Sequence, residues 1–65
     1  MKVSPKDNYH MLGTSITLDS SKVYNAEHAI NQPDWEKRKK IFVLDADDYG
    51  SSFMLAGEDY IIVED

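Results

Sequence analysis

The chain contains no cysteine, which excludes disulfide bonds, thiolate zinc ligands and cysteine nucleophiles together. A secreted domain of 65 residues usually needs such cross-links to supplement its small core, so their absence favours a cytoplasmic location. The longest strictly apolar run covers residues 41–44, and no apolar stretch follows Lys2 and Lys6. The sequence therefore predicts neither a membrane-spanning segment nor a signal peptide.

Glycine is scarce, and its three occurrences stand apart at Gly13, Gly50 and Gly57. This spacing excludes a glycine-rich phosphate loop, and the chain has no Gly-X-Ser-X-Gly nucleophile motif. Carboxylates are plentiful, but acid–base catalysis needs a pair across a cleft with one member in an apolar pocket. A domain of this size has no wall for such a pocket. We therefore predict no catalytic residue, no cofactor and no enzymatic activity.

Two patterns in the sequence are candidate metal sites. Asp45, Asp47 and Gly50 fit positions one, three and six of an EF-hand loop, but the fifth and twelfth positions carry tyrosine and alanine. His10 and His28 are the only histidines, and a zinc site without cysteine needs three or four ligands. The sequence predicts no metal site, and the acidic segment is interpreted as a solvated hairpin loop.

No basic residue occurs beyond position 40, so charge is distributed unevenly. Residues 1–40 hold seven basic and five acidic residues, which gives +2, whereas residues 41–65 hold seven acidic residues and none that is basic, which gives −7. The net charge of −5 disfavours nucleic acid and anionic membranes as partners. Folding either interleaves the two halves into a mixed surface or leaves the acidic third as one face.

The pattern of apolar residues predicts a mostly all-β fold. Residues 12–18 and 22–30 alternate with the two-residue period of half-buried strands and are joined by a turn, so we expect them to form a hairpin. Further strands are expected at residues 41–44, 52–56 and 60–63. A short helical turn is expected near residues 32–38, because Asn31 can cap a helix and Pro33 suits its first turn.

These elements predict a small five-stranded SH3-like barrel or a rolled antiparallel sheet, forming one domain over residues 10–65. Residues 1–9 are predicted to be an N-terminal arm, because Pro5 lacks a hydrogen-bond donor and residues 6–8 favour a turn. Trp35 is expected to close the end of the barrel beneath the helical turn. The other aromatic residues expected in the core are Tyr24, Phe42, Phe53 and Tyr60.

The favoured function is a non-enzymatic interaction or assembly module, whose edge strand or loop face docks onto another protein or onto copies of itself. Its size and lack of cysteine are typical of phage or mobile-element proteins. Aromatic and acidic residues are the candidate partner contacts. They are Tyr9, Trp35, Tyr49, Asp45, Asp47, Asp48, Glu58 and Asp59.

Two alternatives remain open from the sequence. An acidic face formed by residues 41–65 would suit an inhibitor of a basic nucleic-acid-binding protein. Alternatively, Trp35 and the cations Lys37–Lys40 would bind nucleic acid weakly by stacking and phosphate contact. The same cations would also keep the helical turn solvated and protect the strand at residue 41 from edge pairing.

Overall fold

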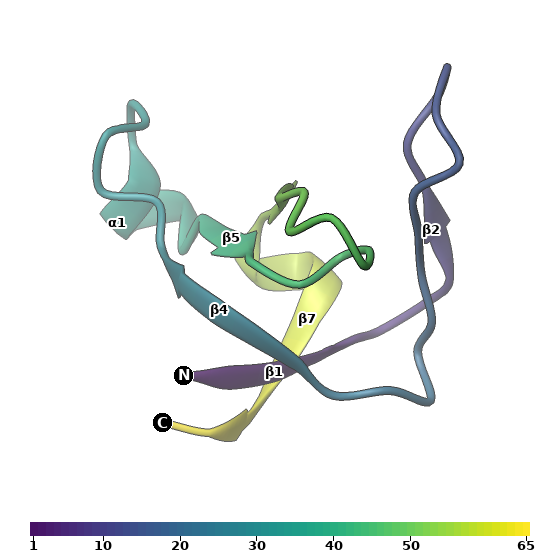
Figure 1. The fold of residues 1–65 in the computed structure, drawn as a ribbon. Helices are drawn as coiled ribbons and strands as arrows, with labels where there is room; N and C mark the ends of the chain where they lie inside the picture. Colours follow the sequence, from purple (N-terminus) through teal and green to yellow (C-terminus); the bar gives the residue numbers. More distant parts are fainter.

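The computed structural model describes residues 1–65, which fold around a curled five-stranded antiparallel sheet (Figure 1). The strand order is β6-β5-β4-β1-β7, and the curl makes the sheet a half-barrel. This confirms the expected rolled antiparallel sheet. Its strands are β1 (Lys2–Pro5), β4 (Tyr24–His28), β5 (Ile41–Val43), β6 (Phe53–Leu55) and β7 (Tyr60–Glu64).

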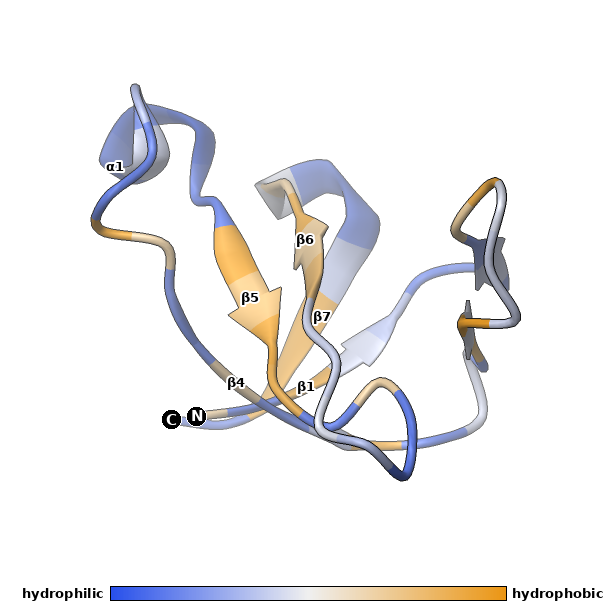
Figure 2. Cartoon of the chain, turned by 45° about the horizontal axis from the view of Figure 1, so that its top comes forward, coloured by the Kyte–Doolittle hydropathy of each residue, from blue (hydrophilic) through white to orange (hydrophobic).

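The core lies on the concave face of the sheet. In β5 the side chains alternate, so Ile41 and Val43 are fully buried while Phe42 between them is only half-buried. The apolar strands converge at the centre of the molecule in Figure 2, and the segment around α1 is polar. Of the four aromatic residues expected in the core, two are buried and two are half-buried. Tyr24 and Tyr60 are buried, whereas Phe42 and Phe53 are not fully enclosed.

The first residues of the chain belong to the sheet rather than to an arm, which corrects the expectation for residues 1–9. β1 lies between β4 and β7, and Val3 is fully buried. Pro5 is tolerated because β1 pairs with β4 only through Lys2 and Val3, so no ladder donor is lost on that side. The pairing of β1 with β7 joins residues almost a chain length apart, which a local pattern does not reveal.

The expected hairpin between residues 12–18 and 22–30 is also wrong. Instead, β3 (Thr17–Leu18) pairs with β2 (Tyr9–His10), and β4 pairs with β1 and β5. The chain turns between the two short strands because the Thr14 hydroxyl donates to the Met11 carbonyl oxygen at 2.7 Å and accepts from the Ile16 N–H. The resulting β2–β3 hairpin projects away from the sheet (Figure 1).

The expected helical turn is present as α1 (Trp35–Arg38), between β4 and β5. Its N-cap is Asp34 rather than Asn31, and both Asp34 and Lys39, which flank the helix, have left-handed backbone conformations. Trp35 is half-buried beside His28, with ring centroids 5.5 Å apart. It therefore neither seals the core nor stands free in solvent. No helix in the chain has the length and apolar character needed to cross a membrane.

Candidate protein-interaction site

Strand β7 forms one edge of the sheet and has only β1 as a neighbour. Three consecutive residues of this strand, Ile61, Ile62 and Val63, each keep at least half of their surface exposed, at 55%, 51% and 53%. An apolar edge strand with unpaired backbone groups is a ready template for another strand. We call Tyr60–Glu64, with this open side, the β7 edge.

The register identifies which backbone groups of the β7 edge are free. Pro5 has no N–H, and it stands opposite Tyr60. The Lys6 N–H donates to the Asp59 carbonyl oxygen one pair away, so hydrogen-bonded and non-hydrogen-bonded pairs alternate from that point. The N–H groups of Tyr60 and Ile62 consequently point away from β1, toward the open side. Beyond Ile62 the register shifts, which twists the end of the strand.

The segment around α1 is fixed against the start of β7. The Tyr60 hydroxyl donates a hydrogen bond of 2.7 Å to the Lys39 carbonyl oxygen. The left-handed backbone at Lys39, with φ of 53°, turns this carbonyl toward Tyr60. In the 3-10 turn η1 (Gly57–Asp59), Gly57 allows close approach, because a Cβ there would lie 2.9 Å from the Lys39 Cβ. The basic run is thereby held at the N-terminal end of the β7 edge.

A groove of about 270 Å³ lies between α1 and β7. Tyr60 and Ile62 line it from β7, and His28 and Trp35 line it from the opposite side. Glu36 and Lys39 supply its charged groups. A strand added to the β7 edge would direct the residue opposite Ile62 onto this same concave face. The groove can therefore receive a side chain from an added strand.

Burial raises the pKa of Tyr60 above its ordinary value of about 10. The phenol stays protonated to higher pH in the folded chain, so its contribution to stability is complete below about pH 10 and is lost as pH rises through the raised pKa. Replacing Tyr60 by Phe removes the bond to Lys39 and should lower the free energy of unfolding by about 1 kcal/mol. Urea unfolding of Tyr60→Phe measures this loss.

The control for this prediction is Tyr49→Phe, because Tyr49 is 94% exposed and its hydroxyl makes no hydrogen bond within the chain. The control should change stability by less than about 0.5 kcal/mol. The alkaline end of the tyrosinate absorbance titration should shrink in Tyr60→Phe, where only Tyr9 keeps a raised pKa, and should remain in Tyr49→Phe. Equal stability of the two variants would show that the Tyr60 hydroxyl does not hold α1 in place.

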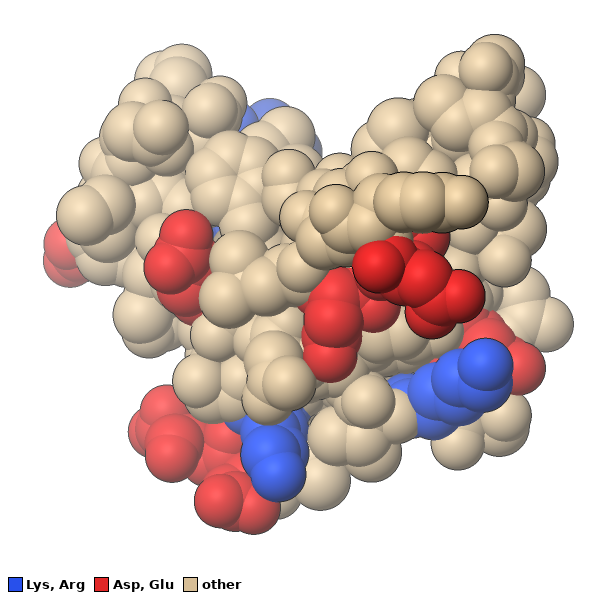
Figure 3. All heavy atoms as spheres, viewed as in Figure 1, with Lys and Arg blue, Asp and Glu red and all other residues tan.

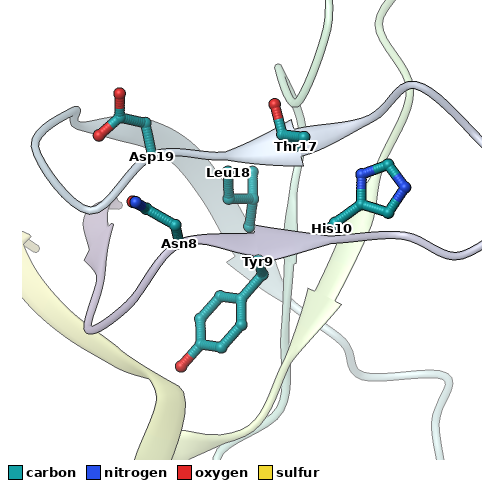
Figure 4. Close-up of a pocket in the computed structure, with 6 residues that line it drawn as sticks. All are labelled: Asn8, Tyr9, His10, Thr17, Leu18 and Asp19. Carbon is teal, nitrogen blue, oxygen red and sulfur yellow. The ribbon is translucent and has the colours of Figure 1, made fainter.

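A second pocket, of about 330 Å³, lies on the β2–β3 hairpin, and four of its six lining residues are polar (Figure 4). In Figure 4, Asn8 and Asp19 lie at one end of the paired strands and His10 and Thr17 at the other, and the Tyr9 ring points away from β3. Tyr9 is half-buried, and its hydroxyl donates a long bond of 3.4 Å to Asp59. Burial and the carboxylates of Asp59 and Asp7 raise the pKa of Tyr9. Tyr9 therefore braces the hairpin against η1.

The acidic candidates of the loop after β5 are partly engaged within the chain. Asp45 accepts hydrogen bonds from the backbone and side-chain amides of Asn25. Asp47 accepts from the N–H groups of Tyr49 and Ser51, and these bonds lower its pKa. Asp48 and Glu58 are exposed. Asp45 and Asp47 thus stabilise the loop through hydrogen bonds, whereas the sequence predicted only that the loop is solvated.

Acidic and basic groups share the face of the molecule shown in Figure 3. Carboxylates lie in several separate groups there, and basic side chains lie among those in its lower part. Above them rise two projections, one that carries α1 and one formed by the β2–β3 hairpin. A hollow lies between the two projections (Figures 1 and 3). On this face acidic and basic side chains are mixed.

Of the predicted contacts, the structure brings Trp35 to the groove beside β7 and Tyr9 to Asp59, and it leaves Tyr49 isolated at a loop tip. The sequence reasoning expected a strand at residues 60–63 but did not single out Ile61, Ile62 and Val63 as contacts. The available signal was a run of three apolar residues followed by Glu64 and Asp65. A strand that is covered on one face only would alternate apolar and polar residues instead.

Comparison of the chain with models of known protein families, with curated proteins and with solved structures finds no match.

Proposed function

We propose that this protein is a non-enzymatic interaction module that binds another protein chain by adding a strand to the β7 edge. The observation that supports this function is the row of half-exposed apolar residues, Ile61–Val63, on a strand with one open side. Backbone hydrogen bonds would supply affinity, and the groove beside Trp35 would select the side chain placed opposite Ile62. An SH3-like description of the half-barrel is part of this proposal, supported by the last strand lying beside the first.

The test is site-specific photo-crosslinking in the cell that makes the protein. A benzophenone amino acid replaces Ile61, whose side chain lies on the convex face next to the open side. The matched control position is Leu12, which is 90% exposed at the tip of the β2–β3 hairpin. A discrete crosslinked species is expected from position 61 and not from position 12. Crosslinking from position 12 alone would contradict the proposal.

A second variant links the crosslink to the strand edge. Ile62→Pro removes the outward N–H while leaving the pairing with β1 intact, because Ile62 occupies a non-hydrogen-bonded position opposite Val3. Ile62→Val keeps the N–H and the β-branched shape. We expect the crosslinked species to fall at least tenfold in Ile62→Pro and to persist in Ile62→Val. Equal crosslinking in both variants would exclude strand addition.

A further inference from the structure

We propose that residues 30–40 form a flap that opens on its own while the sheet stays folded, with Lys39 as its hinge. We call these residues the α1 flap, because they carry α1 and project from the sheet (Figure 1). The flap is bounded by Ala29 and Ile41, which are both fully buried, whereas no residue within it is buried. Few buried apolar contacts are typical of segments that open locally, at a small fraction of the free energy of global unfolding.

The α1 flap is held to the rest of the chain by few contacts. Apart from the bonds to residues 28 and 29 at its base, a single hydrogen bond joins it to the rest of the chain, from the Tyr60 hydroxyl to the Lys39 carbonyl oxygen. The Trp35 ring also lies beside the ring of His28 in β4. Opening therefore breaks one hydrogen bond to β7 and separates one pair of rings, and the strands of the sheet keep their pairing.

The backbone of Lys39 is strained while the flap is closed. It is left-handed, with φ of 53° and ψ of 47°, directly after the last residue of α1. The Lys40 N–H donates to the Trp35 carbonyl oxygen at 2.8 Å, which is the bond of a helix end that glycine usually forms. A side chain makes this backbone conformation less favourable than it is for glycine. Rotation of Lys39 to an ordinary conformation relieves the strain and breaks both the Lys40–Trp35 bond and the bond to Tyr60.

The α1 flap forms one side of the groove beside β7. Half of the residues that line the groove lie on the flap, and the other half belong to the sheet. The flap contributes Trp35, Glu36 and Lys39. Opening removes these side chains from the groove, so the groove has its present shape only while the flap is closed. Rotation at Lys39 therefore controls access to Tyr60 and Ile62 on the opposite side.

Amide hydrogen exchange of the full chain, read by NMR at Lys40 and Leu44, tests the flap. The Lys40 N–H is bonded within the closed flap, whereas the Leu44 N–H donates to the Asn25 carbonyl oxygen of β4 at 2.8 Å. The Lys40 amide should be protected at least about tenfold less than the Leu44 amide. Low concentrations of urea should speed exchange at Leu44 and leave Lys40 nearly unchanged, because local opening exposes little surface.

Variants of the hinge test the role of Lys39. Lys39→Gly relieves the strain and should raise the protection of the Lys40 amide about fivefold. Lys39→Ala is the matched control, because it removes the same charge but keeps the Cβ and the strain, and it should leave the protection unchanged. Tyr60→Phe removes the bond to Lys39 and should lower the protection about fivefold. Acrylamide quenching of Trp35, the only tryptophan, should weaken in Lys39→Gly and strengthen in Tyr60→Phe.

Two outcomes would overturn the inference. In the first, the Lys40 and Leu44 amides have equal protection and the same dependence on urea, which means that the flap opens only when the whole chain unfolds. In the second, Lys39→Gly and Lys39→Ala change the protection equally, which means that the left-handed backbone does not set the opening. Both measurements use the isolated chain, so they are independent of the proposed function, which is judged by the crosslink at position 61.

Discussion

Deleting Lys2–Pro5 is expected to abolish folding. These residues form β1, which is the only link between β7 and the rest of the sheet, and Val3 within it is fully buried. Without β1, the apolar face of β7 has no partner strand, and the remaining sheet is reduced to three strands. A domain of 65 residues has a free energy of unfolding of roughly 3–10 kcal/mol, which cannot absorb this loss.

The deletion is checked by circular dichroism and by the dispersion of amide resonances. The shortened chain should give the spectrum of an unfolded polypeptide. Lys2→Ala is the control, because Lys2 is exposed and its substitution leaves the strand in place. The control should lie within about 0.5 kcal/mol of the original stability. A folded deletion variant would mean that residues 1–9 behave as a dispensable arm.

Replacing Ile41 by Ala should destabilise the protein by about 2–5 kcal/mol. Ile41 is fully buried in β5, where it stands between His28 of β4 and Leu55 of β6. Truncation leaves a cavity at the centre of a small core, and a core of this size has few other side chains to fill it. The expected loss is a large part of the total stability, so the variant should be partly unfolded at room temperature.

Ile30→Ala is the matched control for Ile41→Ala, because it makes the same change at a residue that is 70% exposed. Denaturant unfolding should shift by less than about 0.5 kcal/mol in this control. Equal losses at the two positions would show that the concave face of the sheet is not the centre of the core.

The strands in the second half of the chain were predicted nearly at their observed bounds. Expected strands at 41–44, 52–56 and 60–63 correspond to Ile41–Val43, Phe53–Leu55 and Tyr60–Glu64. Strands β5 and β6 follow one another in the sequence and pair with each other, and β7 lies at an edge of the sheet. Short apolar segments separated by turns mark all three strands clearly. The short helical turn was predicted at nearly the right place, but not for the expected reason, because its N-cap is Asp34 and no side chain caps it.

The first half of the chain was predicted poorly for a physical reason. β1 is short, contains Lys2 and Pro5, and owes its stability to partners that are distant in sequence. The alternation from residue 12 to 18 misled because Leu12 is 90% exposed at a turn closed by the Thr14 side chain. Local periodicity does not distinguish such a turn from a strand.

The candidate site was only partly predictable. An available edge strand was expected, and Trp35 was chosen as a contact, but the residues that border it depend on the fold. Tyr60 was expected only as a core residue, yet its hydroxyl fixes Lys39 and places the basic run at the end of the β7 edge. That arrangement follows from tertiary contacts between residues 21 positions apart, so the sequence alone does not indicate it.

Amide hydrogen exchange at Ile61 and Ile62 tests most directly whether β7 offers an open side that another strand covers. The register directs the Ile61 N–H toward Ser4 of β1 and the Ile62 N–H toward the open side. In the isolated chain, we predict slow exchange at Ile61 and fast exchange at Ile62, and when another strand is bound at the β7 edge both should exchange slowly. An Ile62 amide that is already protected in the isolated chain, or that stays unprotected when a strand is bound, would contradict the account.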